Sequence, residues 1–114
     1  MHEVSLTRNI LEIALSEAVK AGAARIRLIR VKAGALAGVV PEAMEFAFRV
    51  LRDENPVTAE ATLMIEEVSA GCRCRACGLD FEPPDSVFEC PRCGSLDAEI
   101  LRGRELEIAQ LEVI

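Results

Sequence analysis

Cys74-Arg75-Ala76-Cys77-Gly78 and Cys90-Pro91-Arg92-Cys93-Gly94 are two copies of the pattern Cys-x-x-Cys-Gly, with 12 residues between the second and third cysteines. Four thiolates at this spacing can surround one metal ion tetrahedrally, which is how proteins hold structural zinc. The glycine after each pair lets the backbone turn tightly, so that its N–H groups point back at the sulfur atoms. The spacing therefore predicts a structural Zn(II) site with four ligands, which are Cys74, Cys77, Cys90 and Cys93.

Cysteine usage also bears on the compartment and on a rival interpretation. The chain has five cysteines, an odd number, and its start lacks the basic segment and apolar stretch of a secretory signal. We therefore expect a cytoplasmic protein, in which thiols stay reduced, and a metal site rather than a disulfide framework. Cys72 is left over, and we interpret it as a spare thiol; the alternative is a ligand in a Cys-x-Cys pair.

Composition limits the classes of protein that this chain can belong to. Its 114 residues are 51% hydrophobic but include no Trp or Tyr and only four Phe, which predicts a mostly aliphatic core in one globular unit, or in one domain with a small insert. The net charge of −6 argues against a nucleic-acid binder, which usually needs a basic surface. No apolar run approaches the roughly 20 residues of a membrane span, so we expect no membrane partner.

Apolar periodicity predicts two helices and three strands outside the cysteine segment. We expect helices over 3–21 and 41–54, the second opened by Pro41. The expected strands cover 25–37, 60–69 and 104–114. The predicted buried face of the first helix consists of Val4, Leu11, Ala14, Leu15, Ala18 and Val19. That of the second helix consists of Met44, Ala47, Phe48 and Leu51.

The final strand pattern suggests that the chain returns to the first sheet after residue 103. The intervening segment, 71–103, is too short for a hydrophobic core of its own, so metal binding would supply its folding free energy. We therefore predict an α+β fold, with an α/β-type small sheet carrying two helices on one face, plus an inserted zinc-ribbon-like four-cysteine domain. The predicted division is 1–70 with 104–114 against 71–103.

The N-terminus, Met1-His2-Glu3, forms a second constellation of metal ligands, and His2 is the only histidine in the chain. The α-amine of Met1 and the amide nitrogen and imidazole of His2 can chelate one ion through fused rings. Glu3 can add its carboxylate or its amide nitrogen as a fourth donor. Planar nitrogen donors suit Ni(II) or Cu(II) better than zinc. These donors must lose protons to bind the ion, so the metal affinity should decrease as the pH is lowered.

Together these features resemble the HypA/HybF family of hydrogenase nickel-insertion proteins. The resemblance rests on Met1-His2-Glu3, the following amphipathic helix, the paired cysteines and the segment Gly103-Arg104-Glu105-Leu106, and it covers essentially the whole chain. It implies a nickel-binding domain (1–70 and 104–114) with two helices against a small, mostly antiparallel sheet. It also implies a zinc-binding domain over 71–103.

The resemblance further implies a function, partners and site residues. The protein would be a nickel metallochaperone that delivers Ni(II) to the [NiFe]-hydrogenase large-subunit precursor, working with a HypB-type GTPase. His2 would be the essential nickel ligand, completed by the Met1 amine and Glu3, and the four paired cysteines would hold Zn(II). This chain has no histidine in or beside the cysteine segment, so a fifth nickel ligand from there is not expected.

Other interpretations remain open at the level of the sequence. A zinc-ribbon interaction module without nickel delivery fits the paired cysteines, and so does a rubredoxin-like iron carrier. An enzyme is not expected, because the lone histidine is terminal and no nucleophile–base pair or phosphate loop is present. A homodimer is one option for the oligomeric state, because a discontinuous domain can exchange its insert between chains.

Overall fold

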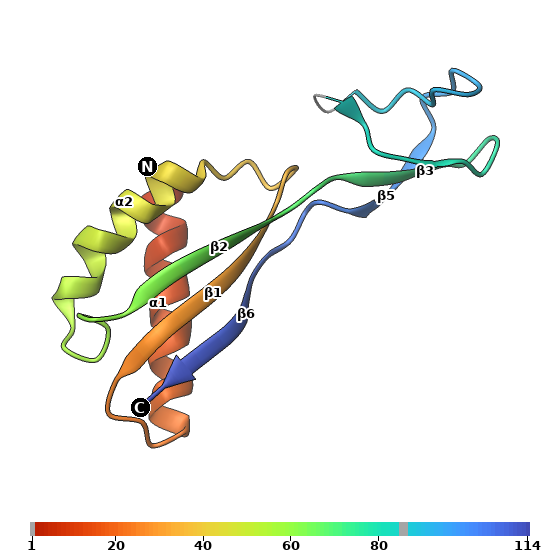
Figure 1. Ribbon diagram of the computed structural model, residues 1–114. Helices are drawn as coiled ribbons and strands as arrows, with labels where there is room; N and C mark the ends of the chain where they lie inside the picture. The colour runs from red at the N-terminus through yellow and green to blue at the C-terminus, as the bar shows by residue number, and fades with distance from the viewer. Residues whose placement is uncertain (1, 85–86) are drawn as a thin grey trace. The chain divides into compact units, whose positions relative to one another are not determined.

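The computed structural model describes residues 2–84 and 87–114, with the side chain of His2 excepted (Figure 1). The described chain divides into two compact units. The first comprises the residues up to Lys32 together with Val39–Glu66 and Glu107–Ile114, and the second comprises Ala33–Gly38 and Glu67–Leu106. The expected domains, 1–70 with 104–114 and 71–103, stay a prediction about which parts fold together.

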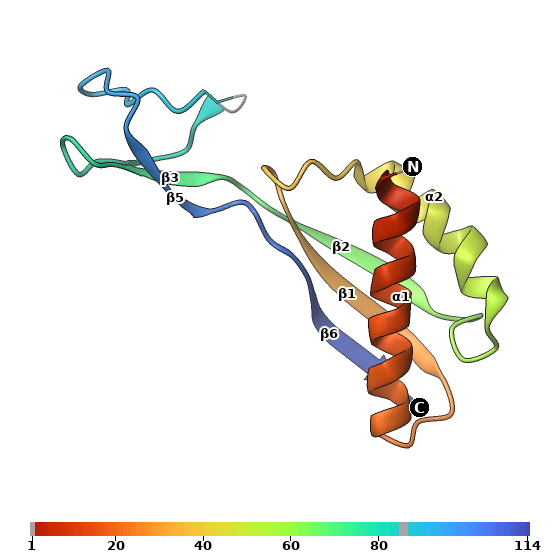
Figure 2. The same cartoon turned by 180° about the vertical axis from the view of Figure 1, so that it is seen from behind.

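The first unit is built on a three-stranded sheet with the order β2-β1-β6. Its strands are β1 (Ile26–Gly34), β2 (Thr62–Val68) and β6 (Leu106–Val113). The helices are α1 (His2–Lys20) and α2 (Pro41–Leu51), and a short 3-10 helix, η1 (Arg52–Glu54), continues α2. Figures 1 and 2 show α1 and α2 on the same face of the sheet. The expected α+β fold with two helices on one face is confirmed.

The strands of this sheet are mixed in direction. Ile26 N–H donates to the carbonyl of Val57, and Ala35 N–H donates to that of Val68, so β1 and β2 run parallel. Ile114 N–H donates to Arg25, and Gly34 N–H donates to Glu105, so β6 runs antiparallel to β1. The expectation of a mostly antiparallel sheet is therefore wrong for β2. Helix α2 connects β1 to β2, and such a crossover returns the chain in the same direction.

The two helices cover the sheet with small and aliphatic side chains. In α2 the buried residues are the expected Met44, Ala47, Phe48 and Leu51. In α1 they are Thr7, Ile10, Leu11, Ala14 and Ala18. Val19 was expected on that face but is 79% exposed, because it lies about 100° around the helix from Ala18. Gly22 has φ 65°, and its N–H donates to the carbonyl of Val19, which ends the helix as expected.

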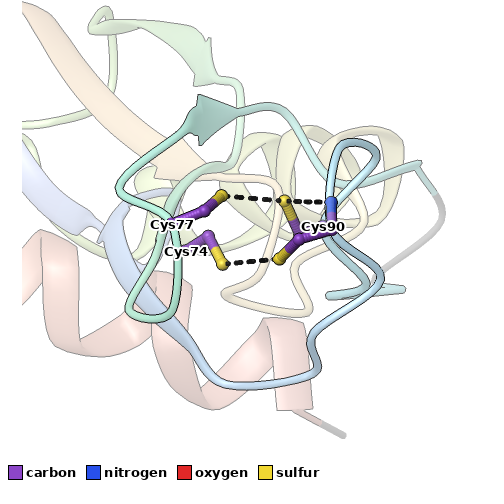
Figure 3. A group of neighbouring side chains, drawn as sticks. Cys74, Cys77 and Cys90 are labelled. Carbon is purple, nitrogen blue, oxygen red and sulfur yellow. Dashed lines mark hydrogen bonds between the residues drawn. The ribbon is translucent and has the colours of Figure 1, made fainter.

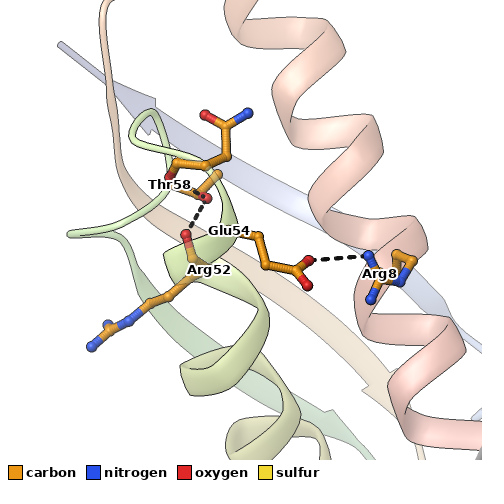
Figure 4. A network of polar contacts seen from close by, with 5 residues as sticks. Arg8, Arg52, Glu54 and Thr58 are labelled. Atoms are coloured by element: carbon orange, nitrogen blue, oxygen red, sulfur yellow. Dashed lines mark hydrogen bonds and ion pairs between the residues drawn. The ribbon is translucent and has the colours of Figure 1, made fainter.

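A small polar network fastens the end of α2 (Figure 4). Thr58 is 1% exposed, and its hydroxyl donates to the carbonyl of Arg52 at 2.8 Å. The guanidinium of Arg52 donates to the carbonyl of Ala61 at 2.7 Å. Arg8 of α1 donates to the carboxylate of Glu54 at 3.1 Å. The Thr58 hydroxyl supplies a partner for a backbone carbonyl at the end of the helix, and the other two contacts tie this end to the loop that follows it and to α1.

The second unit contains an antiparallel sheet with the order β4-β3-β5. Its strands are β3 (Gly71–Cys74), β4 (Asp80–Phe81) and β5 (Ala98–Arg102). Cys72, in the central strand, lies opposite Phe81 on one side and Ile100 on the other. The first cysteine pair begins where β3 ends, so this sheet fixes the position of Cys74.

Two glycines of the second unit, Gly34 and Gly103, allow the backbone to approach closely. Leu36 N–H donates to the carbonyl of Gly103 at 2.7 Å, and Gly34 N–H donates to that of Glu105 at 2.6 Å. A Cβ atom at Gly34 would collide with the Gly103 carbonyl. Gly103 has φ 113°, and its own Cβ would lie 2.8 Å from the Cα of Ala70. Both positions therefore require glycine.

Among the described residues, the helices are too short or too polar to span a lipid bilayer.

Candidate metal centre

The four paired cysteines come together in the second unit (Figure 3). Their sulfur atoms all lie within 4.8 Å of one another. The two shortest separations join the two motifs: Cys74 Sγ lies 3.5 Å from Cys93 Sγ, and Cys77 Sγ lies 3.6 Å from Cys90 Sγ. Cys74 and Cys90 are buried, whereas Cys93 is exposed. The cluster therefore has one side that faces solvent.

The backbone repeats one turn at both motifs. In the first motif, Cys74 N–H donates to Leu79 and Gly78 N–H donates to Cys74, both at 2.8 Å. In the second, Cys90 N–H donates to Ser95 and Gly94 N–H donates to Cys90, both at 2.9 Å. Gly78 and Gly94 have φ 80° and 75°, the left-handed conformation that the sequence motif predicts. We call these two turns, residues 74–79 and 90–95, the knuckles.

The donor set fits a single tetrahedral ion. Four sulfurs at about 2.3 Å from a zinc ion lie about 3.8 Å apart, close to the shortest separations in this cluster. A disulfide needs sulfurs about 2.05 Å apart, and all five cysteines are free thiols. Thiolate ligands of this number and geometry are typical of zinc or iron rather than of hard cations. The two knuckles thus already present four sulfurs at separations that suit such an ion.

The thiols influence one another strongly. The backbone N–H of Leu79 and the side chain of Arg92 lower the pKa of Cys77 to about 6. The backbone N–H of Ser95 lowers the pKa of Cys93, but the sulfurs of Cys74, Cys90 and Cys77 together with desolvation outweigh it and raise this pKa to about 12. Neighbouring thiolates repel one another, so full ionisation of the four groups calls for a cation among them.

The three arginines near the cysteines have different partners. Arg73 pairs with Asp80 at 2.7 Å, and Arg75 pairs with Asp97 at 2.9 Å. Arg92 instead donates to the carbonyl of Cys77 at 2.8 Å. All three arginines lie next to a cysteine of the cluster in the sequence, so the sequence alone does not distinguish their roles. The aspartate partners were missed because they lie opposite the arginines only once β3 and the second knuckle have formed.

Cys72 does not belong to the cluster that the four paired cysteines form. It is 1% exposed, and its strand neighbours Phe81 and Ile100 enclose it in the centre of the sheet. A buried thiol in such surroundings behaves as a small hydrophobic side chain. The interpretation of Cys72 as a residue outside the ligand set agrees with this placement.

The expected nickel ligands lie at the edge of the described residues. Met1 and the side chain of His2 fall outside them, and the backbone of His2 begins α1. Glu3 is in the first turn of α1, where its carboxylate accepts the N–H of Val40 at 3.4 Å. This contact joins the start of α1 to the residue before α2. The grouping of Met1, His2 and Glu3 around one ion stays a prediction.

Comparison with known proteins adds a family to this geometry. Residues 1–113 match the family described as hydrogenase/urease nickel incorporation, metallochaperone, hypA. A relative in Picosynechococcus sp., named hydrogenase maturation factor HypA, is 41% identical over 114 residues and is covered completely, as is this chain. A relative of the same name in Chloroflexus aggregans is also 41% identical, over 98% of each chain.

Solved structures give the same result. The solution structure of the nickel metallochaperone HypA from Helicobacter pylori is 25% identical and matches with a TM-score of 0.71, over 98% of this chain and 97% of that one. A second solution structure, described as HypA protein, is 26% identical with a TM-score of 0.75, over 100% and 97%. The fold of this chain thus recurs in a nickel metallochaperone and in a second HypA structure.

The chain belongs to the HypA family of nickel metallochaperones, as the sequence resemblance predicts. This family acts in hydrogenase maturation and nickel incorporation and is not a family of enzymes, which confirms that expectation for this chain.

Proposed function

We propose that this chain delivers Ni(II) to the [NiFe]-hydrogenase large-subunit precursor. The observation that carries the proposal is the match of residues 1–113 to a family described by nickel incorporation. The relative in Picosynechococcus is covered over its whole length, so no additional domain of that protein is missing from the comparison. The chain would therefore act as a metal carrier in hydrogenase maturation.

In this proposal Ni(II) is cargo, held by the N-terminus. The Met1 amine, the amide and imidazole of His2 and a donor from Glu3 form a planar set, which suits Ni(II). Support comes from the position of Glu3, the expected fourth donor, in the first turn of α1 and next to His2 in the chain. A site at the end of a helix leaves its ligands accessible, so that a partner's ligands can replace them one at a time.

The cysteine cluster has a separate, structural task in the proposal. Zn(II) held by Cys74, Cys77, Cys90 and Cys93 would supply folding free energy to a segment that has few buried apolar side chains. The grouping of the four sulfurs within 4.8 Å supports this assignment. Four thiolates favour zinc and planar nitrogen donors favour nickel, so the two sites sort the two metals by ligand chemistry.

The partners of this cycle are a HypB-type GTPase and the hydrogenase precursor. We propose that both meet the chain in the cytoplasm, where reduced thiols persist. The hydrogenase precursor would approach the N-terminus, because ligand exchange requires contact with the ion. The GTPase would meet either the acidic positions of α2, Glu42 and Glu45, or the polar face of α1. Unchanged GTPase binding after charge reversal at Glu42 and Glu45 would exclude the first surface.

The function is tested by nickel insertion in cells that depend on this protein. Cells carrying His2→Ala should make precursor without nickel and show little hydrogenase activity, and the zinc content of the purified variant should stay normal. Asn9→Ala is a matched control on an exposed position of α1. Normal nickel insertion with His2→Ala would overturn the proposed route through the N-terminus.

A further inference from the structure

Arg92 connects the two knuckles. It lies between Cys90 and Cys93 in the second knuckle, and its Nη2 atom donates to the backbone carbonyl of Cys77 in the first knuckle at 2.8 Å. Cys77 and Cys90 are also the residues whose sulfurs approach to 3.6 Å across the cluster. The guanidinium therefore links the same two knuckles that a bound ion would join.

Arg92 is also the arginine of this region whose charge is not neutralised by an aspartate. Arg73 and Arg75 have carboxylate partners at 2.7 and 2.9 Å. Within residues 2–84 and 87–114, Arg92 interacts with the cysteines of the cluster instead. A divalent ion with four thiolates carries a formal charge of −2, so an unpaired guanidinium beside it is favourable.

We propose that Arg92 is a positioning residue that closes the four-cysteine site and slows the loss of Zn(II). Its hydrogen bond holds the first knuckle against the second, and its charge offsets part of the charge of the zinc–thiolate group. This inference rests on the zinc assignment made above, but it does not depend on nickel binding or delivery.

The expected effect is kinetic. Release of the ion requires at least one sulfur to leave it. When the knuckles move apart in this step, the Arg92–Cys77 contact breaks. A hydrogen bond from a charged donor is worth enough to change a rate by about tenfold. Arg92→Gln, which removes the charge and the forked donor, should therefore release Zn(II) about tenfold faster. Arg92→Lys keeps the charge but loses the planar fork, so its rate should be intermediate.

The test uses the full-length, zinc-loaded chain with an excess of a coloured zinc chelator. The rate of zinc transfer is measured for the wild type, Arg92→Gln and Arg92→Lys. Arg75→Gln is the matched control, because it removes an arginine of the first knuckle that pairs with Asp97; its rate should stay within about twofold of the wild type. The absorption of the Co(II)-substituted proteins reports whether four sulfurs still bind the ion.

Each outcome decides the proposal. Faster release from Arg92→Gln, with an unchanged Co(II)–thiolate spectrum and a normal Arg75→Gln control, supports it. A wild-type rate for Arg92→Gln would overturn it, and equal acceleration in both variants would show a general charge effect instead. Full recovery by Arg92→Lys would overturn the requirement for a planar guanidinium at this position and leave the positive charge as the cause. A wild-type chain that holds no zinc would overturn the zinc assignment and this inference, while leaving the nickel proposal to its own test.

Discussion

Cys74 Sγ lies 3.5 Å from Cys93 Sγ, although 19 positions separate the two residues in the chain. A turn within one knuckle does not account for this short separation, because the two residues belong to different knuckles. An ion at the centre would join the two knuckles into one closed structure. The cluster should accordingly bind its metal in an all-or-none manner.

Replacement of one ligand should abolish zinc binding. Cys74→Ser leaves three sulfurs, and we expect the purified variant to hold less than a tenth of the zinc of the wild type. Elemental analysis after dialysis measures the content. Cys72→Ala is the control two residues away, and it should keep one zinc per chain. Equal zinc in both variants would contradict the assigned ligand set.

Removal of the metal should open the cysteine segment to proteases. Segment 71–103 has short strands and few buried apolar side chains, so its order would depend on the ion. We expect a strong chelator to increase cleavage within this segment at least tenfold, and added Zn(II) should restore protection. Mass spectrometry of the first fragments locates the cuts. Unchanged protection after proven loss of zinc would contradict a structural role for the metal.

Gly34 should tolerate substitution less well than Gly38. A Cβ at Gly34 collides with the backbone of Gly103, and backbone cannot move aside cheaply. We expect Gly34→Ala to lower the free energy of unfolding by about 2–3 kcal/mol. Gly38 has φ 75° and open space around it, so Gly38→Ala should cost only about 1 kcal/mol. Urea titration of both variants tests the order, and a reversed order would contradict the close approach.

Two phenylalanines of α2 should differ sharply in their contribution to stability. Phe48 is 2% exposed and Phe46 is 67% exposed. Phe48→Ala should cost about 3–5 kcal/mol through the cavity that it leaves. Phe46→Ala should change the free energy of unfolding by less than about 0.5 kcal/mol. Similar losses in both variants would mean that α2 is rotated relative to the sheet.

The sequence predicted those features that depend on local patterns. The spacing of the cysteines and their glycines is enough to specify both knuckles, since each turn is formed within six consecutive residues. The buried face of α2 also follows from periodicity alone. Both helices and all three strands of the first sheet were expected, because each has apolar residues at a regular period.

The features that were missed depend on contacts between distant segments. The parallel direction of β2 follows from the route of α2 between the strands, which periodicity does not encode. Strands β3, β4 and β5 are too short for alternation to be recognised, so the opposition of Arg73 and Asp80 could not be foreseen. The close approach of Gly34 to Gly103 joins positions 69 residues apart, so it is visible only in the folded chain.

The central claim is that the N-terminus binds nickel separately from the cysteine cluster. The most direct measurement is a Ni(II) titration of zinc-loaded protein with an untagged, native N-terminus, followed through the optical bands of a planar complex, beside His2→Ala and Glu3→Gln. We predict one zinc and one nickel per wild-type chain, with nickel affinity that falls as the pH is lowered. His2→Ala should lose the nickel and keep the zinc, and Glu3→Gln, which retains the amide nitrogen, separates carboxylate from amide ligation. One zinc with no His2-dependent nickel would contradict the account and leave a zinc-stabilised interaction module in its place.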